Sequence, residues 1–112
     1  MPMGSNLDGS VGGVRVDRRR IGDLCRRFRV RRLDLFGSAV SDHFDPESSD
    51  IDVLVEFESL GPADYADAYF GLREGLEAFF GRNVDLVTES ALANPFFREN
   101  VLATRQALFT EK

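Results

Sequence analysis

The sequence is short of the residues and segments on which several classes of protein depend. One cysteine in 112 residues excludes an internal disulfide and is typical of a reducing cytoplasm. The one histidine, His43, has no second histidine or cysteine nearby, which argues against a histidine-based metal site. No apolar run approaches the about 20 residues that a membrane-spanning helix needs, and no signal-peptide pattern is present. These scarcities predict a cytoplasmic protein without a membrane segment.

The chain is long enough for one small domain. Residues 1–13 are rich in glycine and serine and hold almost nothing apolar, so we expect a disordered tail there. Residues 14–112 remain for the folded domain, which is enough to bury roughly two-thirds of the surface of the unfolded chain.

Charge is distributed unevenly along the chain, although the net charge is only −5. Nine of the fourteen basic residues lie between Arg15 and Arg32, whereas residues 33–99 carry fifteen acids and three arginines. The acidic part argues against a simple nucleic-acid binder. The basic part is most simply the solvated face of a helix, but it could also meet a nucleic acid, an acidic partner or nucleotide phosphates.

The spacing of apolar residues predicts three helices and three strands. The first helix follows a capping Asp17, the second runs from Gly61-Pro62 to Gly81, and the third begins at Asn94-Pro95. Strands are expected at residues 31–36, 50–58 and 83–88. The apolar side of the third helix is predicted to consist of Phe97, Val101, Leu102, Leu108 and Phe109.

This order of elements predicts an α/β fold in which helices cover one side of a small mixed sheet. Cys25 lies on the apolar stripe of the first helix and is interpreted as a core residue. The second helix carries an aromatic-rich stripe, Tyr65 to Phe80, whose ordinary meaning is packing against a sheet, with docking of a partner as the alternative.

The stretch Leu35–Phe57 carries the chemistry. Asp50 and Asp52 open an apolar strand and point the same way, roughly 6–7 Å apart along the backbone. Two carboxylates at the start of a buried strand are costly unless a divalent cation neutralises them. Gly37-Ser38 ends the preceding strand and offers a hydroxyl group and free backbone N–H groups to a phosphate. This combination is typical of phosphoryl or nucleotidyl transfer.

A third acid, Asp85, lies in the next predicted strand between apolar neighbours. If the three strands pair side by side, Asp50, Asp52 and Asp85 converge and repel one another until a cation binds. Two Mg²⁺ ions about 3.5–4 Å apart could be bridged by such a trio. Asp85 could then receive the proton of the acceptor hydroxyl, while Gly37 and Ser38 hold the β- and γ-phosphates.

The ordered set of a Gly-Ser turn, an Asp-x-Asp pair and a third Asp resembles the minimal nucleotidyltransferases (MNT) of the DNA polymerase β superfamily. The resemblance extends from about Ile21 to Leu108 and includes Asn94–Arg98. It implies the polymerase-β-like nucleotidyltransferase fold, with triphosphate bound by Gly37 and Ser38 and metal bound by Asp50, Asp52 and Asp85. The Arg-Gly that commonly follows the Gly-Ser turn is replaced here by Ser41-Asp42.

The same resemblance implies a biological role, because these proteins are the antitoxins of HEPN/MNT toxin–antitoxin pairs. The expected reaction transfers AMP from ATP to a tyrosine of a HEPN toxin, which is thereby silenced. The chain has no room for a domain that presents an acceptor, so we expect another protein or a second copy to hold it, as a hetero-oligomer or homodimer. Two alternatives stay open: neutralisation of a HEPN ribonuclease by binding alone, and nucleotidyl transfer to a small molecule or RNA.

Overall fold

The computed structural model describes residues 9–11, 14–37 and 50–111. The strands are β1 (Gly9–Val11), β2 (Val14–Val16), β3 (Val30–Phe36), β4 (Ile51–Phe57), β5 (Val84–Thr88) and β6 (Gln106–Thr110), and the helices are α1 (Arg18–Arg27), α2 (Pro62–Phe80), the 3₁₀ helix η2 (Glu89–Ala93) and α3 (Pro95–Thr104). Within these ranges the order of the elements is β1, β2, α1, β3, β4, α2, β5, η2, α3 and β6. No helix among these described residues is both long and apolar enough to cross a membrane.

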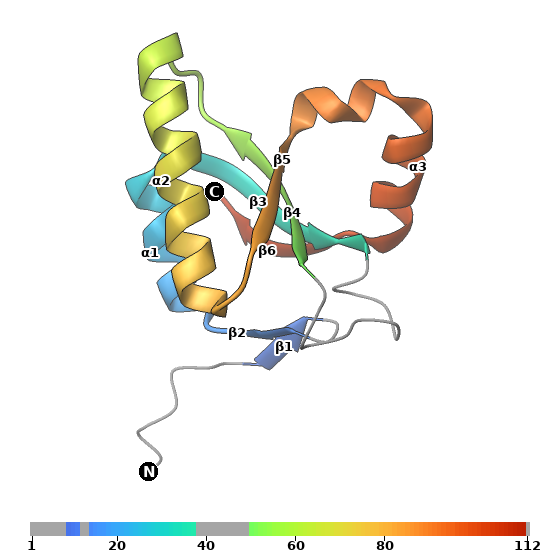
Figure 1. Cartoon of the computed structure of the whole chain (residues 1–112), viewed down its shortest axis with the longest axis horizontal. Coiled ribbons are helices and arrows are strands. Elements are labelled where there is room, and N and C mark those ends of the chain that lie inside the picture. Colours follow the sequence, from blue (N-terminus) through green and yellow to red (C-terminus); the bar gives the residue numbers. More distant parts are fainter. Residues whose placement is uncertain (1–8, 12–13, 38–49, 112) are drawn as a thin grey trace.

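Four strands form the central sheet in the order β5-β4-β3-β6 (Figure 1). The strand β3 pairs antiparallel with both β4 and β6, whereas β4 and β5 are parallel and are connected through α2. The end of β3 and the starts of β4 and β5 therefore lie side by side. They form one edge of the sheet, the edge that runs across the strand ends. The predicted α/β fold with a small mixed sheet is confirmed.

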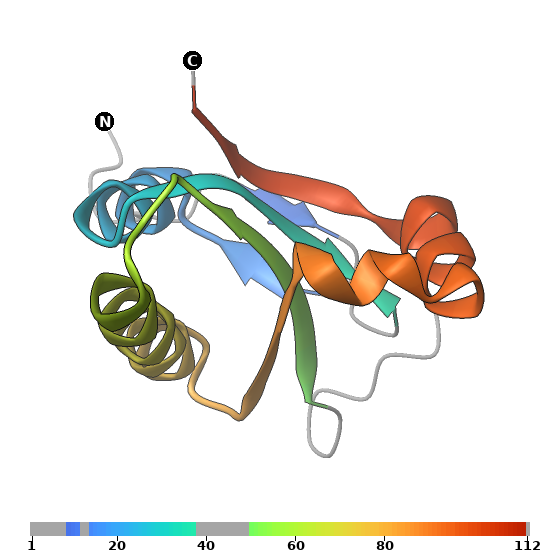
Figure 2. The same ribbon diagram turned by 90° about the horizontal axis from the view of Figure 1, so that it is seen from above.

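Helices cover both faces of the sheet, which corrects the expectation that they cover one (Figure 2). On the larger side, α1 and α2 pack against the alternating residues Ile51, Val53 and Val55 of β4. On the other side, α3 and η2 cover Phe36 and Leu54. The sequence does not indicate that α3 and η2 cover this face, because the residues of β3 and β4 that point to it are a mixture of acids and apolar residues.

Helix α1 begins where a local signal predicts, and helix α2 both begins and ends where local signals predict. The carboxylate of Asp17 accepts hydrogen bonds from the backbone N–H groups of Arg19 and Arg20, both at 3.1 Å. Helix α2 begins at Pro62 and ends at Gly81, whose φ of 70° is the left-handed conformation that suits glycine.

Close contact between α1 and α2 depends on two glycines four residues apart on one face of α2. A Cβ atom at Gly71 would collide with the ring of Phe28, and one at Gly75 would lie 2.5 Å from a methyl group of Leu24. Leu24 lies on α1 and Phe28, four residues later, is the C-cap of that helix, so the two helices interlock over this length.

Two expectations about the ends of the chain are corrected. Gly9–Val11, inside the expected disordered tail 1–13, pairs with Val14–Val16 as a two-stranded sheet, while residues 1–8 and 12–13 lie outside the described residues. Leu108 and Phe109 belong to the strand β6 and not to the third helix, which ends at Thr104.

Pairing with the buried strand β3 explains why the last segment is a strand. Residues 33–36 of β3 are all buried, so its second edge would leave unpaired backbone groups unless another strand covered it. Arg105, directly after α3, also reaches back to the buried carboxylate of Asp34, with 2.7 Å between Nη2 and Oδ2. Leu108, in β6, is buried in the main core.

Candidate active site

Asp52 is the middle one of three paired residues that lie side by side on β3, β4 and β5, at the edge formed by the strand ends. Its register partners are Phe36 on β3 and Asp85 on β5. Paired residues on neighbouring strands of a sheet point to the same face, with strands about 4.8 Å apart, so the carboxylates of Asp52 and Asp85 are neighbours. A hydrogen bond of 3.1 Å from the Ile51 N–H to the Asn83 carbonyl joins the starts of β4 and β5. The predicted approach of Asp52 and Asp85 is thus present in the fold.

The surroundings of Asp52 disfavour the ionised form of its carboxyl group. Burial raises the pKa of Asp52, and the charges of Asp85 and Asp50 raise this pKa further. Asp50 and Asp85 are exposed, whereas Asp52 is half-buried. The ion pairs observed among the described residues involve other acids, namely Asp23, Asp34, Glu56, Glu58 and Glu77. The three carboxylates make this edge of the sheet anionic.

Gly37 forms the wall of the site beside Asp52. Its φ of 68° is left-handed, and a Cβ atom built on it would lie 2.8 Å from Oδ2 of Asp52. The Asp52 carboxylate therefore rests against the glycine Cα, which no other residue type allows without displacement.

The backbone N–H of Gly37 is not free, which corrects the expectation from the sequence. It donates a hydrogen bond of 2.9 Å to Oγ1 of Thr104, at the end of α3. Thr104 lies 67 residues further along the chain. Neither the spacing nor the composition of the sequence indicated that this residue meets the site.

The donor set fits a divalent cation in its chemistry. Carboxylate oxygens are the ligands that Mg²⁺ prefers, and a cation would relieve the repulsion that raises the pKa of Asp52. Among the described residues, however, no three or more His, Cys, Asp or Glu side chains are placed so that together they could hold a metal ion. Asp50, directly before β4, is exposed.

Comparison with known proteins assigns the family. Residues 18–108 match the nucleotidyltransferase domain. The chain belongs to this family. The matched range contains Gly37 and all three aspartates, so the predicted nucleotidyltransferase is confirmed at the level of the family.

Relatives of this nucleotidyltransferase include a protein adenylyltransferase, MntA, of Thermococcus cleftensis, which is 43% identical over 70 residues, covering 62% of this chain and 67% of MntA. A candidate protein adenylyltransferase of Methanocaldococcus jannaschii is 33% identical over 75 residues, covering 67% and 73% of the two chains. The structure of a candidate minimal nucleotidyltransferase has a TM-score of 0.57 and 36% identity, with 80% of this chain and 86% of that chain covered.

The fold is also similar to one found in a toxin–antitoxin complex. The crystal structure of a mutant MntA complex of this kind has a TM-score of 0.61 and 21% identity to this nucleotidyltransferase, covering 87% of this chain and 76% of that chain.

The remaining predicted residues divide into those that the structure places and those that it does not. Ser38 and His43 lie outside the described residues. Cys25 is fully buried, as predicted, and burial raises the pKa of its thiol to about 12. The aromatic-rich stripe of α2 packs into the core through Leu72 and Leu76. Most of the described arginines on and after α1 are exposed, and several contact acids or rings of the same chain.

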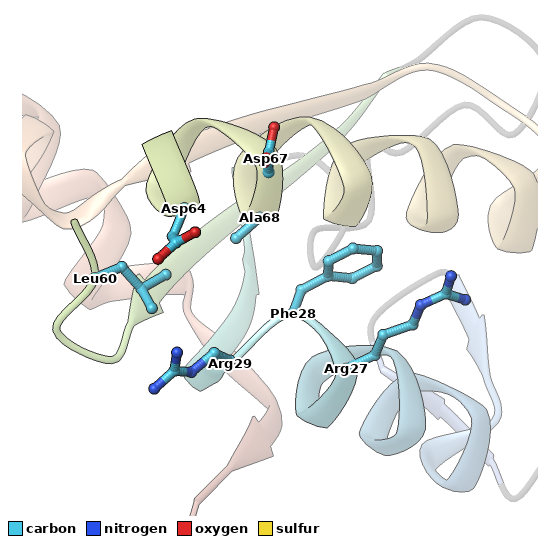
Figure 3. A pocket seen from close by; sticks show the side chains of 7 residues that line it. All are labelled: Arg27, Phe28, Arg29, Leu60, Asp64, Asp67 and Ala68. Carbon is cyan, nitrogen blue, oxygen red and sulfur yellow. The ribbon is translucent and has the colours of Figure 1, made fainter. Parts of the chain in front are cut away.

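A pocket of about 240 Å³ lies between the end of α1 and the start of α2 (Figure 3). The ring of Phe28 lies between the two helices, and Asp64 and Asp67 come from α2. Arg29 leads into β3 and Leu60 follows β4, so this pocket is at the opposite end of the sheet from Asp52. It is not part of the nucleotidyltransferase site.

Proposed function

We propose that this protein transfers AMP from ATP to a hydroxyl group, that of a tyrosine, on a HEPN toxin and thereby acts as its antitoxin. The observation that carries the proposal is the anionic edge formed by Asp52 and Asp85 beside the left-handed Gly37, within a chain of the nucleotidyltransferase family. The names of the relatives support the choice of AMP and of a protein acceptor. The toxin–antitoxin structures, one of them with AMP-PNP, support the choice of partner and nucleotide.

The residues of this chain would divide the work as follows. Asp50 and Asp52 would hold metal at the nucleotide, and Asp85 would complete the set and receive the proton of the acceptor hydroxyl. Mg²⁺, with two ions expected, would supply charge neutralisation at the phosphates and lower the pKa of the attacking hydroxyl group. Gly37 and Ser38 would line the triphosphate, with Ser38 and backbone groups other than the Gly37 N–H as donors.

The position of Asp85 suits an acceptor from outside the described fold. Asp85 lies on the edge strand β5 and is exposed, so a hydroxyl group from another chain can approach it. This placement is consistent with a macromolecular acceptor.

The test uses the protein encoded beside this one, which the proposal expects to be a HEPN toxin, incubated with this protein, Mg²⁺ and ATP labelled at either the α- or the γ-phosphate. Label from the α position on the partner, lost with Asp52→Asn, is the expected result. Label from the γ position alone would identify a kinase. A tight complex that silences the partner without label would assign the antitoxin effect to binding, and label on RNA or a small molecule would assign a different acceptor.

A further inference from the structure

The face of α3 that looks onto the sheet ends at the candidate active site. Phe97, Val101 and Thr104 are spaced four and three residues apart and so lie on one side of the helix. The Phe97 ring makes an edge-to-face contact with Phe36, with 5.4 Å between ring centroids, and Val101 is fully buried. Phe36 precedes Gly37 and is the register partner of Asp52. Helix α3 therefore packs against the end of β3 that lies beside Asp52.

The Thr104 hydroxyl group is fixed by two hydrogen bonds. It donates to the Asn100 carbonyl at 2.9 Å and accepts from the Gly37 N–H at 2.9 Å. The first bond is the ordinary back-bond of threonine to the carbonyl four residues earlier. Because it orients the hydroxyl proton toward α3, a lone pair of Oγ1 is directed to Gly37, and the two bonds strengthen each other.

Gly37 transmits this contact to Asp52. Its left-handed backbone presents a bare Cα to the Asp52 carboxylate, and a Cβ atom there would be only 2.8 Å from Oδ2. A rotation of the Gly37 peptide unit would therefore change the space that the carboxylate occupies. Thr104, Gly37 and Asp52 form a direct chain of contacts from α3 to the anionic edge.

We propose that Thr104 is a positioning residue: its hydroxyl group holds Gly37 in the left-handed conformation, and Gly37 in turn sets the position of the Asp52 carboxylate. The effect of Thr104 on the rate of AMP transfer rests on the proposed function. Its effect on the position of the Asp52 carboxylate does not.

Three variants separate this role from a merely structural one. Thr104→Val keeps the shape of the side chain and removes the hydroxyl group, and Thr104→Ser keeps the hydroxyl group and removes the methyl group. Thr88→Val is the matched control, because it removes a hydroxyl group whose contact is Ser90, at 2.9 Å and at the far end of β5.

The first measurement is made without nucleotide or partner, by NMR. We expect Thr104→Val to speed amide exchange at Gly37 and to shift the carboxyl carbon signal of Asp52, whereas Thr104→Ser and Thr88→Val leave both unchanged. An unshifted Asp52 signal in Thr104→Val would overturn the proposal. So would an equal shift in Thr104→Ser, because the methyl group and not the hydroxyl would then be responsible.

The second measurement is label transfer at saturating ATP. Thr104→Val should lower kcat by about three- to tenfold, the rate equivalent of one net hydrogen bond, with little change in KM for ATP. A lower KM with unchanged kcat would overturn the proposal, because Thr104 would then merely compete with phosphate for the Gly37 N–H. If the wild-type protein transfers no label, the proposed function fails, and the positioning role stands or falls on the NMR result.

Discussion

Replacing Gly37 by alanine should damage the site far more than it damages the fold. The φ of 68° is strained for alanine by about 1–2 kcal/mol, and the lower entropy of the unfolded alanine chain offsets about 0.4–1 kcal/mol of this. The net loss of stability is then about 1 kcal/mol. For a domain of about 100 residues this lowers Tm by roughly 4–8 °C, which thermal unfolding without metal can measure.

The effect on transfer should be larger because the new methyl group would lie 2.8 Å from Oδ2 of Asp52, and the carboxylate must move. A misplacement on the order of 1 Å at a reacting centre can cost about a hundredfold in rate. We therefore expect single-turnover transfer of α-labelled AMP to fall by about ten- to a hundredfold.

Gly81→Ala is the matched control for this prediction. Gly81 has nearly the same φ, 70°, but its Cβ would meet nothing within 4 Å. It should lose the same stability as Gly37→Ala and keep wild-type transfer. Equal losses of transfer in the two variants, or wild-type transfer by Gly37→Ala, would refute the argument that Gly37 positions Asp52.

Three further predictions concern charge, packing and burial. Because burial and the neighbouring acids raise the pKa of Asp52, its ionised form weakens the fold at neutral pH and less so as the pH falls. Asp52→Asn should therefore melt no lower than wild type without metal, yet gain nothing from Mg²⁺-ATP in a thermal-shift assay. A clear drop in its Tm would mean that the carboxylate is structural. Gly75→Ala should lower the free energy of unfolding, measured by chemical denaturation, by about 1–3 kcal/mol because its methyl group clashes with Leu24. Gly22→Ala is the control and should lower it by nothing, since its Cβ would meet only the flexible end of an arginine. Equal effects of the two variants would contradict the interlocking of α1 and α2. Burial raises the pKa of Cys25 from 9.0 to about 12, so the folded state loses stability as the pH rises above 9 and the thiol of the unfolded chain ionises. The Tm difference between wild type and Cys25→Ala should therefore shrink between neutral pH and about pH 10. A constant difference would show that the thiol is not buried.

Local signals in the sequence were sufficient for the elements on which the site is built. The capping residues Asp17 and Asn94 and the pair Pro62 and Gly81 set the ends of helices where predicted. The meeting of Asp52 and Asp85 was also predictable, because a parallel pair of strands brings both starts to one edge.

Contacts between distant segments were not predictable. Leu108 and Phe109 continue the helical spacing of Val101, and only pairing with β3 makes their segment a strand. The bond between Gly37 and Thr104 likewise depends on how α3 lies over the sheet, which no local pattern encodes. Both failures have the same cause, since tertiary packing overrides local preference.

The most direct test of the proposed function is the intact mass of the HEPN partner after co-expression with this protein. We predict that the partner gains the mass of one or more AMP units on a tyrosine with the wild-type protein, and none with Asp52→Asn or Asp85→Asn. A partner that is silenced without any gain in mass, or that gains AMP equally with Asp52→Asn, would contradict nucleotidyl transfer at this site.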